Sequence, residues 1–318
     1  SLTLAGLAAA KVAGLCAFAS GFLLTRVELR DASACDDFPH AAADDADAAS
    51  PAPGFPGCWS RAPVNKAVVL VIDGARFDFA GPARAVGNPP AAGSGTRGAD
   101  GSSASASPPP PPPMSVFGDL LARDGPSFGD LFRFVADPPT TTQQRLKGLL
   151  TGGLPTFADV GDSFGGGAAL REDNVVHIAA ARMGLRIAFS GDDTWLDLFP
   201  DPRASFRAGY EPFPSFDVKD LDLVDEGVRR HLNATLAEPE RWDVLIGHFL
   251  GVDHAGHAHG VRSEAMRRKL AENDADVRRV VAAMERSGAY DDAMLLVFGD
   301  HGMTLAGDHG GGTPEETD

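Results

Sequence analysis

Two segments in the second half of the chain place aspartate and histidine directly after a short apolar run. The first, residues 247–260, reads GHFLGVDHAGHAHG and follows the apolar residues 244–246. The second, residues 295–303, reads LLVFGDHGM and is followed shortly by Asp308 and His309. Short apolar runs with polar residues at their exits are typical of buried strands, so we interpret each segment as a strand that delivers polar side chains into a turn behind it.

Six of the nine histidines lie between His248 and His309. A single histidine is most often a surface or hydrogen-bonded core residue, but two clusters with aspartate at a strand exit favour metal binding. Neutral imidazole together with carboxylate suits zinc, with manganese as the alternative, better than a thiolate-type site does. The two segments therefore predict a site for divalent cations.

Strand-like and helix-like segments alternate along the chain. Residues 67–72, AVVLVI, form a β-branched run ending at Asp73, and residues 186–189 predict a further strand. Helical periodicity predicts helices over residues 173–182, 221–232 and 266–284, and a short one that opens at Thr140–Thr142. We therefore expect an α/β domain with a predominantly parallel sheet and helices on both faces, whose ligands gather at the carboxyl ends of the strands.

The polar residues at the expected strand ends are sufficient for two metal ions, which can stabilise both the entering and the leaving oxygen of a phosphoryl displacement. A threonine at a helix N-terminus gains from the positive end of the helix dipole as its alkoxide forms, so we expect a phosphothreonine intermediate. The candidate set is Asp73, one of Thr140, Thr141 and Thr142, Asp253, His257, Asp300, His301 and His309.

The first 25 residues are expected to form a transmembrane helix, because residues 2–24 are apolar apart from Lys11. A cleavable signal peptide or a buried helix is the alternative. Residues 26–63 are expected to be a linker, and residues 64–318 the catalytic domain. Within that domain, the Gly/Ser/Pro-rich residues 82–113 predict a disordered insertion.

The net charge, the cysteines and a glycosylation sequon indicate the partners and the compartment of the chain. The net charge of −16 argues against nucleic acid as a partner, since no basic stripe is present. Cys35 and Cys58 can pair in an oxidising lumen, and Asn233 starts an Asn-Ala-Thr sequon that fits the same placement. We expect a fragment of a longer protein whose C-terminal membrane region is missing.

The order Asp, Thr, Asp-x-x-x-His, Asp-His, His resembles that of the alkaline phosphatase superfamily, which includes nucleotide pyrophosphatases and phosphodiesterases. Longer stretches, among them VIDGARFDF, DPPTTTQQRLKGLLTGGLPTF, WDVLIGHFLGVDHAGH and FGDHGMTLAGDHGG, are similar to the family of GPI ethanolamine phosphate transferases, type 3. The resemblance covers nearly the whole chain except residues 82–113.

This resemblance implies transfer of phosphoethanolamine from phosphatidylethanolamine to a mannose, the third, of the GPI-anchor precursor. It implies an endoplasmic reticulum membrane protein with a lumenal catalytic domain and a small membrane partner subunit. Two Zn²⁺ are implied, one held by Asp253, His257 and His309, the other by Asp73, Asp300 and His301. Thr142 is implied as the bridging nucleophile because it stands before a helix that ends in Thr-Gly.

Several alternatives stay open. Thr140 or Thr141 replaces Thr142 if the register is shifted, and His248, His254 and His259 match no ligand position, so a supporting or surface role is expected for them. A phosphodiesterase or phosphatase would use the same site with water as the acceptor. A phosphoglycerate mutase is disfavoured by the membrane helix, and an inactive scaffold by the presence of every ligand.

Overall fold

The computed structural model describes residues 2–22, 29, 31–33, 64–80, 114–124, 129–156 and 169–317. Its centre is a five-stranded sheet in the order β3-β2-β4-β1-β5, in which every strand pair is parallel. The strands are β1 (Lys66–Ile72), β2 (Ile187–Asp192), β3 (Gly209–Phe213), β4 (Val244–Phe249) and β5 (Ala293–Phe298). Parallel strands end at one common edge, so residues that follow β1, β4 and β5 are brought together there.

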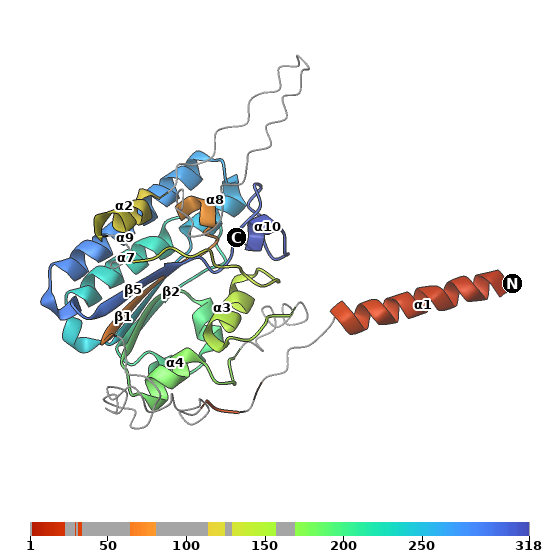
Figure 1. Cartoon of the computed structure of the whole chain (residues 1–318), viewed down its shortest axis with the longest axis horizontal. Coiled ribbons are helices and arrows are strands. Elements are labelled where there is room, and N and C mark those ends of the chain that lie inside the picture. Colours follow the sequence, from red (N-terminus) through yellow and green to blue (C-terminus); the bar gives the residue numbers. More distant parts are fainter. Residues whose placement is uncertain are drawn as a thin grey trace, which may run out of the picture.

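Helices cover both faces of the sheet (Figure 1). Side chains alternate along β1, so Val68, Leu70 and Ile72 pack into one core and Val69 into the other. The first core is closed by α2 (Ser115–Asp124), α7 (Leu223–Leu236), α8 (Gly251–His259) and α9 (Glu264–Glu285). The second is closed by α3 (Thr142–Thr151), α4 (Val175–His177), α5 (Thr194–Leu198) and Phe206, which directly follows α6 (Pro202–Ser205). The expected fold class is confirmed.

Short elements complete the described part of the chain. The helix expected over residues 173–182 is one α-helical turn, α4, continued by a π-helix, Ile178–Arg182. Three 3-10 helices and a last short α-helix connect the larger elements: Phe77–Ala80, Pro239–Arg241, Gly288–Tyr290 and α10 (Pro314–Thr317).

Two expectations need correction. Residues 251–259 form helix α8 instead of a turn, because the Asp225 carboxylate accepts the backbone N–H groups of Leu250 and Gly251 and secures the start of the helix. Strand β3 was not expected; it pairs only with β2 at the edge of the sheet, where its Pro212 is tolerated.

Helix α1 (Leu2–Phe22) stands away from the α/β body (Figure 1). Its residues Leu4–Gly21 have a mean hydropathy of 1.5, none of them buried, so the helix is long and apolar enough to cross a membrane. A signal sequence has the same features, so crossing stays a prediction. Cys35, Cys58 and the expected insertion, residues 82–113, lie outside the described residues.

Candidate functional site

All seven residues expected at the site lie near the carboxyl edge of the sheet. Asp73 follows β1, Asp253 and His257 lie on α8 behind β4, and Asp300 and His301 follow β5. Thr142 is the first residue of α3, and His309 lies in the loop before α10. The parallel sheet therefore collects residues that are up to 236 positions apart in the sequence, from Asp73 to His309.

One group consists of Asp73, Asp300 and His301, whose ligand atoms lie within 4.8 Å of one another. Nε2 of His301 is 3.3 Å from Asp73 Oδ1 and 3.5 Å from Asp300 Oδ2, and all three side chains are fully buried. Burial, together with the charge of Asp300, raises the pKa of Asp73 well above its usual value. Asp73 Oδ1 and Asp300 Oδ2 lack hydrogen-bond partners, and a divalent cation would satisfy both oxygens.

A second group consists of Asp253, His301 and His309. Nε2 of His309 is 3.2 Å from Asp253 Oδ1 and 2.8 Å from Nε2 of His257, and His257 is itself 3.4 Å from Asp253 Oδ2. His301 is thus common to both groups, while the expected ligand His257 lies at the solvent side, 30% exposed. Two ring nitrogens this close need a proton or a cation between them, which the expected metal would supply.

In the second group, Asp253 and His309 shift each other's pKa. Burial opposes the charged form of His309, but its hydrogen bond to Asp253 and the charge of Asp253 outweigh burial and raise the pKa of His309 to about 9. Burial likewise acts to raise the pKa of Asp253, but the hydrogen bond and charge of His309 lower it to about 2. A cation held by imidazole would replace the charge that protonated His309 provides here.

Backbone carbonyls orient two of the imidazoles. Nδ1 of His301 lies 2.9 Å from the carbonyl oxygen of Gly302, and Nδ1 of His309 lies 2.7 Å from that of Thr140. A carbonyl only accepts, so each Nδ1 carries a proton and, in a neutral ring, Nε2 presents its lone pair to the cluster. This arrangement is typical of metal-binding histidines. The donor set therefore fits zinc.

The three threonines have different partners. Thr142 Oγ1 donates to Asp73 Oδ2 at 3.2 Å and lies 3.5 Å from His301 Nε2. Thr140 Oγ1 donates to the carbonyl of Gly311 and accepts from N–H of Gly310, and Thr141 Oγ1 contacts the side chain of Gln144 within the first turn of α3. Of the three hydroxyls, only that of Thr142 contacts the group of Asp73, Asp300 and His301.

The other histidines of the region lie outside the two groups. His254 is held through both ring nitrogens by the backbone carbonyls of Asp220 and Ser215, and His259 is exposed. His248 is fully buried and lies 3.5 Å from Asp73 Oδ2. It forms a third group with Asp73 and Asp192. A strand was expected over residues 186–189, but Asp192 near its carboxyl end was not recognised as a site residue.

Comparison with known proteins gives the family. Residues 190–311 match the profile of type I phosphodiesterase / nucleotide pyrophosphatase. GPI ethanolamine phosphate transferase 3, catalytic subunit, of Mus musculus is 41% identical over 308 residues, which are 94% of this chain and 25% of that protein. The Homo sapiens protein of the same name is 40% identical over 304 residues, with the same two coverages.

A solved 2-O GAG sulfatase superposes on 80% of this chain and 63% of its own, with a TM-score of 0.49 and 13% identity, too distant to inform function. The chain spans about a quarter of the length of the curated relatives it matches. Identity near 40% over almost the whole chain indicates common descent. The chain therefore belongs to the family of GPI ethanolamine phosphate transferases.

Proposed function

We propose that this chain is the catalytic part of an enzyme that transfers phosphoethanolamine from phosphatidylethanolamine to a mannose, the third, of the GPI-anchor precursor. The names of its relatives support the reaction class. The observation that carries the proposal is the placement of Thr142: its hydroxyl begins helix α3 and contacts both Asp73 and His301 of the buried cluster.

The transfer proceeds in two displacements. Thr142 Oγ1 attacks phosphorus, a new Oγ–P bond forms, and the bond from phosphorus to the glycerol oxygen breaks, which releases diacylglycerol. The hydroxyl proton passes along the hydrogen bond to Asp73 Oδ2 and from there to the departing glycerol oxygen, which leaves as the hydroxyl group of diacylglycerol. A mannose hydroxyl then attacks phosphorus and gives up its own proton, the Oγ–P bond breaks, and Thr142 regains a proton.

The backbone of α3 supports the same step. Its first N–H groups have no partners within the helix, so they can donate to phosphoryl oxygens bound there, whose negative charge the helix dipole would stabilise. Arg145, which is 2% exposed, donates from Nε to the carbonyl oxygen of Asp300 and from Nη1 to that of Asp137. These bonds fasten α3 to the end of β5, so nucleophile and acidic cluster keep their relative position.

Two zinc ions, or manganese as the alternative, would lower the pKa of the attacking hydroxyl and neutralise the phosphoryl oxygens. Asp253, His257 and His309 would hold one ion, and Asp73, Asp300 and His301 the other, with Thr142 as a further ligand. Asp73 Oδ1 and Asp300 Oδ2, which have no hydrogen-bond partner, support this assignment. His301 lies close enough to serve either ion.

The cellular setting is part of the proposal. Residues 1–25 anchor the chain in the endoplasmic reticulum membrane, residues 26–63 are a lumenal linker, and residues 64–318 are the lumenal catalytic domain. The donor and acceptor are both lipid-linked, which suits an anchored enzyme, and a small membrane subunit is the expected partner.

A phosphodiesterase that passes the same group to water is the second candidate, and the family match over residues 190–311 favours it. Lipid analysis of cells that lack the full-length protein separates the two. Transfer predicts accumulation of a GPI precursor that is short of one phosphoethanolamine, restored by the wild-type protein but not by Thr142→Ala. A normal precursor profile together with phosphodiesterase activity of the purified protein would establish the hydrolytic function instead.

A further inference from the structure

After His301 and His309, His248 is a third imidazole whose Nε2 lies near a carboxylate of the site. It lies on β4 opposite Val71 of β1, is 0% exposed, and its Nε2 is 3.5 Å from Asp73 Oδ2. The backbone of Gly191 packs against it with φ of 144°, where any Cβ would collide with the His248 backbone. The β4 backbone is therefore tightly packed at His248, and the buried imidazole lies beside Asp73, which contacts the nucleophile.

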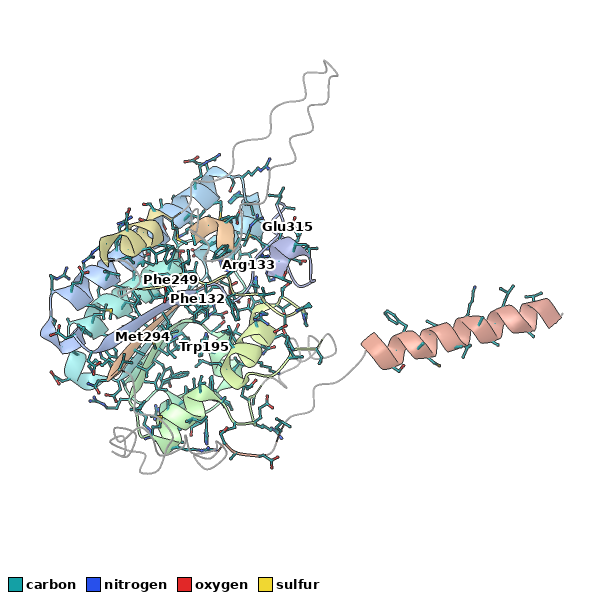
Figure 2. All side chains as sticks on the ribbon, viewed as in Figure 1. Phe132, Arg133, Trp195, Phe249, Met294 and Glu315 are labelled. Atoms are coloured by element: carbon teal, nitrogen blue, oxygen red, sulfur yellow. The ribbon has the colours of Figure 1, made fainter. Side chains whose placement is uncertain are left out.

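The partner of Nδ1 distinguishes His248 from His301 and His309. Nδ1 of His248 lies 2.9 Å from Nε1 of Trp195, and both side chains are buried. Trp195 lies in the interior of the α/β body (Figure 2). An indole N–H only donates, so Nδ1 must accept and the proton of the neutral ring resides on Nε2. As neutral rings, His301 and His309 present a lone pair to the carboxylates of the site, whereas neutral His248 presents an N–H group.

This tautomer decides what the group Asp73, Asp192 and His248 can do. Ligation of a third cation would require a lone pair on Nε2 and hence a proton on Nδ1, which would face the indole proton across a buried contact. The group is therefore unsuited to metal, although its ligand atoms lie within 4.8 Å of one another.

Nε2 of His248 has no hydrogen-bond partner, and the nearest described carboxylate oxygen is Asp73 Oδ2. The separation of 3.5 Å is roughly 0.5 Å longer than an ordinary N–H···O bond, so a small shift of either side chain completes it. Asp73 Oδ2 also accepts from Thr142, while Oδ1 faces His301.

We propose that His248 is a positioning residue, whose Nε2–H holds the Asp73 carboxylate with Oδ2 toward Thr142 and Oδ1 toward the metal, and that Trp195 sets the tautomer for this role. The inference rests on the proposed function, since it takes Asp73 as a ligand. Groups that orient ligands typically contribute about 10–100-fold to metal affinity or activity.

Two substitutions separate the two hydrogen bonds of the ring. His248→Gln retains an N–H donor at the position of Nε2, whereas His248→Asn retains only an acceptor for Trp195. In the full-length protein, zinc dissociation constants from chelator competition should rise about 10–100-fold at one site in His248→Asn and stay within about three-fold of wild type in His248→Gln. His248→Asn should also have a lower kcat than His248→Gln, with KM for phosphatidylethanolamine unchanged in both.

Trp195→Phe retains an aromatic ring but loses the N–H donor, so it should weaken zinc binding in the same direction and by less than His248→Asn. It also carries the comparison if His248→Asn does not fold. His231, half-buried on α7 beside Glu211, is the matched control, and its Gln and Asn variants should bind zinc like wild type.

Equal zinc affinities in His248→Gln and His248→Asn, or an unchanged affinity in Trp195→Phe, would overturn the positioning role. Loss of a third zinc ion from both His248 variants would show that His248 is itself a ligand. Asp73→Asn separates this inference from its premise: if that variant retains two tightly bound zinc ions, the ligand assignment in the proposed function is wrong, whatever His248 does.

Discussion

Helix α8, which carries Asp253 and His257, is held at its start by one buried carboxylate. Asp225 Oδ1 accepts the N–H groups of Leu250 and Gly251, each at 2.9 Å, and Oδ2 pairs with Lys269 Nζ at 3.2 Å. Both charged side chains are at most 1% exposed. Asp225→Ala removes both functions, whereas Asp225→Asn keeps Oδ1 for the helix and places an amide N–H₂ against the ammonium group.

The magnitudes follow from these contacts. Breaking a buried ion pair by removing one partner costs about 3–5 kcal/mol, and leaving a buried N–H without an acceptor costs about 1–3 kcal/mol. Lys269 retains Asp222 and Glu272, each at 2.8 Å, which reduces the first contribution. We therefore expect losses of unfolding free energy of about 2 kcal/mol for Asp225→Asn and about 4 kcal/mol for Asp225→Ala.

The assay is urea unfolding of the purified protein in detergent, with zinc content measured on the same samples. Glu238→Gln is the control, because its pair with Arg241 is exposed and should contribute less than about 1 kcal/mol. Asp225→Ala should also lower zinc occupancy, since it releases the helix that carries two ligands. Equal losses for Asp225→Ala and Asp225→Asn would refute the reasoning, because the bonds to α8 would then contribute nothing.

Three further predictions follow. Elemental analysis should find about two zinc ions per chain, and His257→Ala should empty one site whereas Asp300→Ala empties the other; absence of transition metal would contradict this. Hydrogen bonds from Arg186 lower the pKa of Asp243, so their stabilisation is present above the unfolded pKa of about 4 and is lost as pH falls through the lower folded value. Unfolding free energies should therefore show that Asp243→Asn costs roughly 1 kcal/mol at pH 7 and almost nothing in strong acid; an equal cost at both pH values would contradict the linkage. Glycosidase treatment should shift the mass of the wild-type protein but not of Asn233→Gln, and digestion of the domain by protease outside sealed microsomes would reverse the proposed orientation.

Much of the fold could be predicted because buried parallel strands have an unambiguous pattern. The β-branched run of β1 and the apolar starts of β4 and β5 marked the strands after which Asp73, Asp253 and Asp300 follow. Helix α8 could not be predicted, because its Gly251 and Gly256 disfavour a helix locally. Both glycines are required by tertiary contacts: a Cβ would collide with Asp225 at the first and with Met303 at the second.

Details of the site depended on contacts that sequence spacing does not contain. The position of His301 between the two metal groups follows from the registry of β5 beside β1. The tautomer of His248 depends on Trp195, 53 residues earlier in the chain. The choice among three threonines rested on resemblance, and the structure distinguishes them by the partner of each hydroxyl.

The most direct test of the account is to identify the residue that becomes phosphorylated. Purified full-length protein is incubated with phosphatidylethanolamine without acceptor, quenched in acid, digested, and mapped by mass spectrometry. We predict a phosphoethanolamine adduct on Thr142, lost in Thr142→Ala together with transfer but with metal content unchanged, and retained in part by Thr142→Ser. An adduct on Thr140 or Thr141, or full transfer by Thr142→Ala, would contradict the central claim.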